Sequence, residues 1–347
     1  MENKQVDRLG SILAKYFTNG SWVVEEKESG INNTTRYVQA EGKTFVLRIY
    51  ENHAEPEKVA FEHAVLEALG KAELNFGIPQ PYPSEEGGTW VTADDGKLAV
   101  LFRYMEGERA NLEEPGMAAS AGETVGRLVG ALSGVEIAAP PAYEPYYDIY
   151  HVHPLVTRER LGEWLEEMSG RGFSAEADQV RTALQELERD LPELQGQLPV
   201  QLVHSDIVYG NMLASGGRIS AVLDFEFVTP DWRAMELAVL LSELFPPESL
   251  DPAVPEAEER CWRAAEQALK GYGRAAALTA AEIAALPRLM LLRRLVLVPH
   301  FLGRYLAGVE GEERALHYLT SFAKVSRLIG EQGPRLGAIA ERYIRKE

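Results

Sequence analysis

The sequence contains a single cysteine, Cys261, among its 347 residues. One thiol cannot form an internal disulfide, and no cysteine cluster exists that could hold a metal. Long apolar runs are also missing: the most apolar stretch, 286–302, is interrupted by three arginines, whereas a bilayer span needs roughly 20 apolar residues. The polar N-terminus lacks the apolar core of a signal peptide. These absences favour a cytoplasmic protein without a membrane partner.

Positive charge is scarce relative to negative charge. The chain has 35 Lys and Arg against 53 Asp and Glu, a formal net charge of −18. This balance argues against nucleic acid as the main partner, because phosphate backbones bind basic surfaces. It mildly favours a cationic substrate through long-range steering, although a solvated acidic surface explains the same charge equally simply.

Residue periodicity divides the chain near residue 104. The first part is expected to follow the order β-β-β-α-β-β after a short helix: helix 6–17, strands 21–28, 35–40 and 44–50, helix 56–69, strands 89–93 and 98–103. The second part is mainly helical, with periodicity in 116–133, 158–168, 175–190, 232–244, 256–271, 280–297 and 312–331. The sequence therefore predicts an α+β fold with two lobes. The smaller, antiparallel β lobe with one main helix occupies 1–104, and the larger helical lobe occupies 105–347. A cleft between two such lobes is where small ligands bind.

A hairpin interrupts the helical part. Residues 212–214 and 219–223 have strand character and flank a Ser-Gly-Gly-Arg turn. The hairpin brings Asn211, before its first strand, near Asp224, after its second, with Asp206 on the adjoining loop. Asn and Asp oxygens suit Mg²⁺, which takes only one or two protein carboxylates plus substrate phosphates. Asp206 would orient an attacking hydroxyl group and accept its proton late in phosphoryl transfer.

His204-x-Asp206-x-x-x-x-Asn211 followed by Asp224-Phe225-Glu226 resembles the catalytic and metal loops of the aminoglycoside phosphotransferase and choline kinase superfamily, relatives of the protein kinases. Glu226 stands where protein kinases have Gly, which fits the small-molecule branch. The resemblance implies a protein-kinase-like fold, ATP and Mg²⁺ as cofactors, Asp206 as the catalytic residue, and Asn211 and Asp224 as metal ligands. It makes His204 structural.

The same resemblance implies where ATP binds. The residues implied are Gly30, Asn32, Asn33 and Thr34 over the phosphates, Val46 against the adenine, Arg48 as the phosphate-binding cation, Glu62 as its partner, and Phe102 and Tyr104. Many kinases have Lys where Arg48 stands, and Arg is not equivalent to Lys. The polar loop alone is equally typical of an ordinary hairpin, and Glu62 alone of a solvated helix face.

The acceptor site is expected in the helical lobe. Its candidates are Glu226, Asp231, Trp232, Arg293 and Arg304, and the aromatic segment 146–153 is a further candidate lining of the cleft. Asp231 is equally typical of a helix N-cap, and each arginine is more typical of a snorkelling or carboxylate-paired side chain than of an acceptor contact. Glu236 is structural by resemblance: it stands where relatives commonly have the Asp that braces the catalytic loop.

The leading hypothesis is a kinase that moves the γ-phosphoryl group of ATP to a hydroxyl group of a small molecule. Residues 30–35 and 45–48 are most similar to homoserine kinase type II and its bacterial relatives, while amino alcohols and aminoglycosides remain open. A carboxylate-bearing acceptor such as homoserine would need a basic clamp, for which Arg293 and Arg304 are candidates. The alternatives are a bacterial Ser/Thr protein kinase of the stress-response type and a non-catalytic nucleotide-binding module. A monomer or homodimer is expected.

Overall fold

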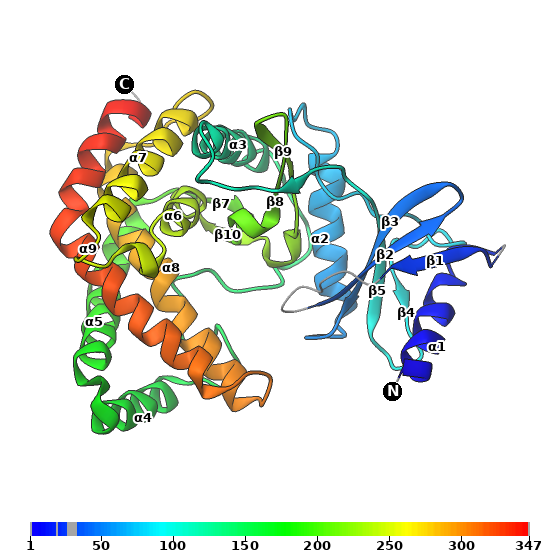
Figure 1. Ribbon diagram of the computed structural model, residues 1–347, viewed down its shortest axis with the longest axis horizontal. Coiled ribbons are helices and arrows are strands. Elements are labelled where there is room, and N and C mark those ends of the chain that lie inside the picture. Colours follow the sequence, from blue (N-terminus) through cyan, green and yellow to red (C-terminus); the bar gives the residue numbers. More distant parts are fainter. Residues whose placement is uncertain (1, 19, 26–32, 346–347) are drawn as a thin grey trace.

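The computed structural model of the chain describes residues 2–18, 20–25 and 33–345. Two lobes are visible, a small one built on an antiparallel sheet and a larger one built mainly of helices (Figure 1). The predicted α+β, bilobal fold class is therefore confirmed. Within the described residues, no helix has the length and apolarity required to cross a membrane.

The small lobe is a five-stranded sheet in the order β1-β2-β3-β5-β4, with all pairs antiparallel. Its elements are α1 (Glu2–Leu13), β1 (Trp22–Glu25), β2 (Asn33–Ala40), β3 (Lys43–Tyr50), α2 (Pro56–Leu69), β4 (Val91–Thr92) and β5 (Leu98–Arg103). The predicted β-β-β-α-β-β order is confirmed. The strand expected over 89–93 is shorter, and part of the strand expected over 21–28 lies outside the described residues.

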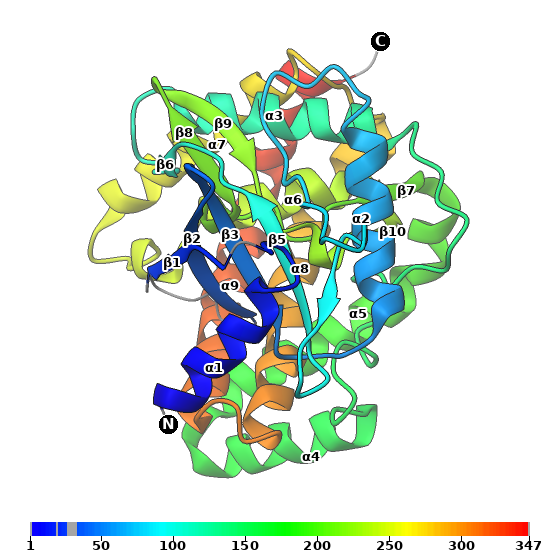
Figure 2. The same ribbon diagram turned by 90° about the vertical axis from the view of Figure 1, so that its right-hand side faces the viewer.

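Alternation along β3 decides what each face of the sheet contacts. Phe45, Leu47 and Ile49 are buried in the cluster that contains α1, which lies across one face of the sheet (Figure 2). Arg48 and Tyr50 point to the opposite face, because successive strand residues alternate sides. Full burial of such an apolar side chain contributes about 1.5–3 kcal/mol, so the outer layer holds β3 rigidly against α1 and presents Arg48 inward.

The large lobe contains seven α-helices among its described residues. They are α3 (Met117–Leu132), α4 (Arg158–Met168), α5 (Ser174–Gln197), α6 (Ala234–Glu243), α7 (Pro255–Tyr272), α8 (Ala280–Leu306) and α9 (Glu312–Ile344). Glycines allow α3 and α7 to approach closely: a Cβ atom on Gly122 would lie 1.9 Å from the carbonyl oxygen of Ala268, and one on Gly271 would lie 1.9 Å from that of Ala119. Helices α8 and α9 extend further than their periodicity predicted.

Two small sheets lie between these helices and the small lobe. The sheet β6-β8-β9 consists of β6 (Glu108–Arg109), β8 (Met212–Ser215) and β9 (Arg218–Val222), so the predicted hairpin is confirmed. The other sheet pairs β7 (Val200–Val203) with β10 (Thr229–Trp232). Because β10 includes Trp232, the helix expected over 232–244 begins only at Ala234. Residues 104–107 connect β5 to β6, and the domain boundary expected at 104/105 stays a prediction.

Candidate active site

The hairpin β8–β9 and the loop before it bring the predicted motif together. The backbone N–H of Leu223 donates to the carbonyl of Asn211 at 2.8 Å, which places Asp224 beside the start of β8. The imidazole of His204 is fully buried; its Nε2 lies 2.9 Å from the carbonyl oxygen of Leu223, and its Nδ1 accepts from the N–H of Asp206 at 3.2 Å. Burial lowers the pKa of His204. A neutral imidazole therefore joins the two halves of the motif and is not placed to transfer protons.

The backbone is strained at two points of this centre. Ser205 and Asp224 have φ values of 69° and 65°, in the left-handed region that few residues other than glycine adopt. Glu236 holds the first of them, because its fully buried Oε1 accepts from the N–H of Ser205 at 2.9 Å. Burial raises the pKa of Glu236 to about 7. Glu236 thus contacts the loop that contains Ser205 and Asp206, and its role as a brace of that loop stays a prediction.

Asp206 has partners on both carboxylate oxygens. The Asn211 amide nitrogen donates to Oδ2 at 2.9 Å, and Nη2 of Arg293 on α8 donates to Oδ1 at 2.9 Å. About a quarter of the Asp206 side chain stays exposed, 26%. The two hydrogen bonds therefore fix the direction of the carboxylate, while part of it stays accessible from outside.

Asn211 and Asp224 fit a divalent cation that also binds phosphate oxygens. The Asn211 amide nitrogen is engaged with Asp206, so its amide oxygen is the atom directed at a cation. The Asp224 side chain is 29% exposed at the end of β9. No group of three or more His, Cys, Asp or Glu side chains suited to a metal occurs in the described part of the chain. Two oxygen donors on adjoining segments would fit a divalent cation that takes its other ligands from a substrate and from water.

Arg48 links the small lobe to this centre. Its Nη1 lies 3.4 Å from Glu62 and 3.1 Å from Oδ1 of Asp224, the latter without the alignment of a hydrogen bond. Glu62 also accepts from the Tyr50 hydroxyl at 2.6 Å, and burial raises the pKa of Glu62 to about 7. The alternative of a solvated helix face for Glu62 is therefore wrong, since its side chain is 2% exposed.

The remaining residues predicted to bind ATP fall into three groups: some lie outside the described residues, some pair with carboxylates, and some pack against the core, around Arg48 or between the lobes. Gly30 and Asn32 lie outside the described residues. The Thr34 hydroxyl donates to Glu51 at 2.9 Å, and the Asn33 amide nitrogen donates to Glu226 at 2.7 Å, so neither side-chain donor is directed at phosphate. Val46 packs against the core, Phe102 lies with its ring 5.3 Å from the Arg48 guanidinium, and Tyr104 is 38% exposed at the crossing between lobes.

The structure contradicts two of the acceptor candidates. Trp232 is fully buried with its ring 4.7 Å from that of Tyr147. Asp231 is fully buried too, and its carboxylate accepts from the N–H groups of Tyr146 at 2.7 Å and of Trp232 at 2.6 Å. The N-cap alternative for Asp231 is also wrong, because the cap position of α6 is Arg233. Pairing with β7 carries both side chains into the core.

Two other candidates lie away from the acceptor side. Glu226 turns toward the small lobe, where Asn33 and Asn52 donate to its carboxylate. Arg304 pairs with Glu310 at 2.8 Å and lies about 16 Å along α8 from Arg293. Arg293 is thus the predicted acceptor residue that contacts Asp206.

Tyr146 is a residue whose role the sequence did not predict. Its hydroxyl donates to the carbonyl of Ser205 and accepts from Nη1 of Arg293 at 2.7 Å. The aromatic run 146–153 was the available signal, but only folding shows which ring reaches the catalytic loop. Tyr146 and Arg293 together hold Asp206 from the side opposite Asn211.

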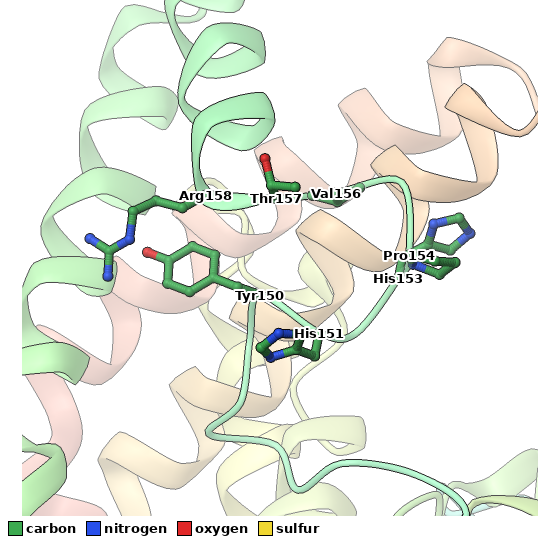
Figure 3. A pocket seen from close by; sticks show the side chains of 7 residues that line it. All are labelled: Tyr150, His151, His153, Pro154, Val156, Thr157 and Arg158. Atoms are coloured by element: carbon green, nitrogen blue, oxygen red, sulfur yellow. The ribbon is translucent and has the colours of Figure 1, made fainter.

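A surface hollow of about 460 Å³ lies further along this segment. Its lining consists of Tyr150, His151, His153, Pro154, Val156, Thr157 and Arg158. Figure 3 shows Arg158 beside the Tyr150 ring, with the guanidinium 4.7 Å from the ring centroid, while His153 points the other way toward α8. The His153 ring packs on Gly303 of that helix. The hollow is separate from the Asp206 centre, since none of its lining residues is a described contact of Asp206, Asn211 or Asp224.

Residues 23–278 match the model of the phosphotransferase enzyme family, and the chain belongs to that family. The homoserine kinase of Beijerinckia indica is 26% identical over 234 residues, covering 67% of this chain and 68% of that protein. The homoserine kinase of Zymomonas mobilis is 24% identical over 238 residues, covering 68% and 69%.

Solved structures show the same fold. A microcompartment-associated aminopropanol kinase superposes with a TM-score of 0.65 at 18% identity, covering 96% of this chain and 98% of that one. An amicoumacin kinase in complex with AMP-PNP and Ca²⁺ gives a TM-score of 0.63 at 17% identity, covering 95% of this chain and 93% of that one. The predicted family and the predicted enzyme class, a kinase with an alcohol group as acceptor, are confirmed.

Proposed function

We propose that this chain transfers the γ-phosphoryl group of Mg²⁺-bound ATP to the hydroxyl group of a small hydroxy amino acid of the homoserine type. The observation that carries the proposal is the convergence of Asp206, Asn211 and Asp224 opposite Arg48 of the small lobe. The homoserine kinases among the relatives support the reaction.

The residues support a direct transfer. Asn211 and Asp224 would hold Mg²⁺, which neutralises charge on the transferred group, and Arg48 would contact the phosphates. Asp206 orients the acceptor hydroxyl group. The oxygen of that hydroxyl group forms a bond to the γ-phosphorus while the bond from the phosphorus to the bridging oxygen of ADP breaks. The hydroxyl proton passes to Asp206 and then to solvent. Asn211 and Arg293 keep the Asp206 carboxylate aimed throughout.

Charge beside Asp206 favours an acceptor that carries a carboxylate. A hydroxyl group bound at Asp206 would lie next to the guanidinium of Arg293, which is 11% exposed and donates to Asp206 and Tyr146. A carboxylate close to the hydroxyl can share this cation, and Arg pairs with carboxylates through a fork of donors. An acceptor that carries only an amine would place a second cation there. The proposed acceptor is therefore an amino acid rather than an aminoglycoside.

The test is an acceptor panel with Mg-ATP, measured by coupled ADP release and by mass spectrometry of the product. The panel contains homoserine, 3-amino-1-propanol, an aminoglycoside and a Ser/Thr peptide mixture. Asp206→Asn is expected to lower kcat about 10²- to 10⁴-fold, the usual contribution of a positioned base. Asp178→Asn, an exposed carboxylate on α5, is the matched control. Full activity of Asp206→Asn, or transfer only to peptide, would contradict the proposal, and ATP binding without turnover on the whole panel would leave a non-catalytic module.

A further inference from the structure

The carboxylate of Glu226 lies in a contact between the two lobes. It belongs to the turn after β9 in the large lobe, two residues beyond Asp224, and its side chain is 2% exposed. Both oxygens accept from small-lobe amides: Oε2 from Asn33 at 2.7 Å and Oε1 from Asn52 at 2.8 Å. A buried carboxylate is thus shared between segments of the two lobes.

Two further groups complete the surroundings of Glu226. The hydroxyl of Tyr143, from the large-lobe segment between α3 and α4, donates to Oε1 at 3.3 Å. Nε2 of His53, in the small lobe, lies 3.8 Å from the same oxygen. A buried carboxylate that loses its donors is strongly destabilised, because it keeps the desolvation penalty without compensation. Separation of the lobes at this point is therefore opposed.

The small-lobe partners of Glu226 flank the strand that carries Arg48. Asn33 begins β2 and pairs with Tyr50, and Asn52 follows the end of β3 by two residues. On the other side, Asp224 and Glu226 share one short turn. The hydrogen bonds of Glu226 to Asn33 and Asn52, here called the tether, therefore connect the strands β2 and β3 to the turn 224–226, the metal loop. They lie within a few residues of Arg48 and Asp224, of which Nη1 and Oδ1 are 3.1 Å apart.

We propose that Glu226 is a positioning residue that couples the nucleotide-binding lobe to the metal loop and sets the distance between Arg48 and Asp224. The inference rests on the proposed function, since the distance matters only if a metal-bound nucleotide lies between the lobes. Glu226 contacts neither the nucleotide nor the acceptor in this role. It acts through Asn33 and Asn52, whose side-chain amides would hold β2 and β3 at a fixed distance from Asp224.

Glu226→Gln tests the tether with little change of volume. The substitution replaces one acceptor oxygen with an NH₂ group that faces the NH₂ donors of the partner amides. The KM for ATP is expected to rise about tenfold with a lower kcat, because one hydrogen bond across the lobes is lost and the other no longer involves a charged acceptor. The KM for the acceptor should stay unchanged. Glu67→Gln on the exposed face of α2 is the control, with a side chain 75% exposed.

A double variant separates positioning from folding. In Asn33→Asp combined with Glu226→Gln, the carboxylate and amide exchange places, so the hydrogen bond across the lobes is restored at unchanged total charge. The double variant should return the KM for ATP to within about threefold of the wild type, as expected for a coupled pair. Failure of the double variant to recover, or an unchanged KM for ATP in Glu226→Gln despite a lower melting temperature, would overturn the proposal.

Binding of the non-hydrolysable analogue AMP-PNP with Mg²⁺, measured by calorimetry, keeps this test independent of the acceptor. If the proposed acceptor class is wrong, Asp206→Asn still binds AMP-PNP normally, and Glu226→Gln still binds it about tenfold more weakly. Equal affinity of wild type and Glu226→Gln for AMP-PNP would refute the coupling role, whichever acceptor is phosphorylated.

Discussion

Replacing Arg293 with glutamine removes the guanidinium that bridges Asp206 and Tyr146. Its Nη2 donates to Oδ1 of Asp206 at 2.9 Å and its Nη1 to the Tyr146 hydroxyl at 2.7 Å. The side chain is 11% exposed, so water compensates little for the loss. Asn211 still holds the other oxygen of Asp206, and the variant is therefore expected to fold.

The magnitude follows from these contacts. A hydrogen bond to a charged group contributes about 1.5–3 kcal/mol, so loss of the bond to Asp206 corresponds to roughly a 10- to 100-fold loss in kcat/KM if the carboxylate reorients. An acceptor carboxylate bound by the same guanidinium adds a second loss that appears in the acceptor KM. An acceptor without a carboxylate shows only the first loss.

The assay compares two acceptors that differ only in the carboxylate, homoserine and 3-amino-1-propanol. Arg293→Gln is expected to lower kcat for both and to raise the KM for homoserine alone. Tyr146→Phe is the companion variant, because it removes one partner of Arg293 and leaves the guanidinium in place. An equal loss of kcat/KM with both acceptors would mean that Arg293 only positions Asp206 and does not bind the acceptor carboxylate. An unchanged kcat/KM for homoserine would refute both roles of Arg293.

Three further predictions concern metal, packing and pH. Asp224→Asn should lower activity at least about 100-fold and raise the Mg²⁺ concentration for half-maximal rate, measured by metal titration. Gly122→Ala should destabilise the fold by about 3 kcal/mol or more in urea unfolding, since its Cβ atom meets backbone on α7, whereas Gly130→Ala, with open space around it on α3, should not. Burial raises the pKa of Asp231 to about 7, so the native state holds a proton there that the unfolded chain releases near pH 4. This contribution to stability, at most about 4 kcal/mol, is full below pH 4 and is lost as pH rises to 7. Asp231→Asn should reduce the slope in pH-dependent melts without abolishing it, because burial also raises the pKa of Glu62 and of Glu236 to about 7. A slope unchanged in Asp231→Asn would assign the titration to another group.

Local patterns in the sequence were sufficient to predict much of the scaffold. The hairpin over 212–222 has strand character on both sides of a Gly-Gly turn, and β3 alternates between apolar residues that face α1 and residues such as Arg48 on the opposite face. Both signals depend on residues adjacent in the sequence, and the folded structure keeps the hairpin and the strand that they predict. The spacing of His204, Asp206 and Asn211 belongs to the same class, because one short loop contains all three.

Boundaries failed where pairing with a distant strand competed with local periodicity. Residues around Trp232 continue a helical pattern, yet β7 is paired with them and draws Asp231 into the core. The interpretation of Asp231 as a helix cap or an acceptor contact failed for this reason. No pattern within a short window reports that a strand 30 residues earlier offers hydrogen bonds.

The sequence by itself determined the catalytic loop, the hairpin and the order of elements, because these follow from residues that are close along the chain. Only the tertiary structure decided that Arg293, 87 residues after Asp206, donates to its carboxylate, and that Glu226 faces Asn33 rather than an acceptor. The physical reason is that a local sequence pattern does not determine the direction in which a side chain points. A left-handed turn at Asp224 and the packing of α8 against α6 and α9 set where these side chains point, and both depend on contacts that exist only in the folded chain.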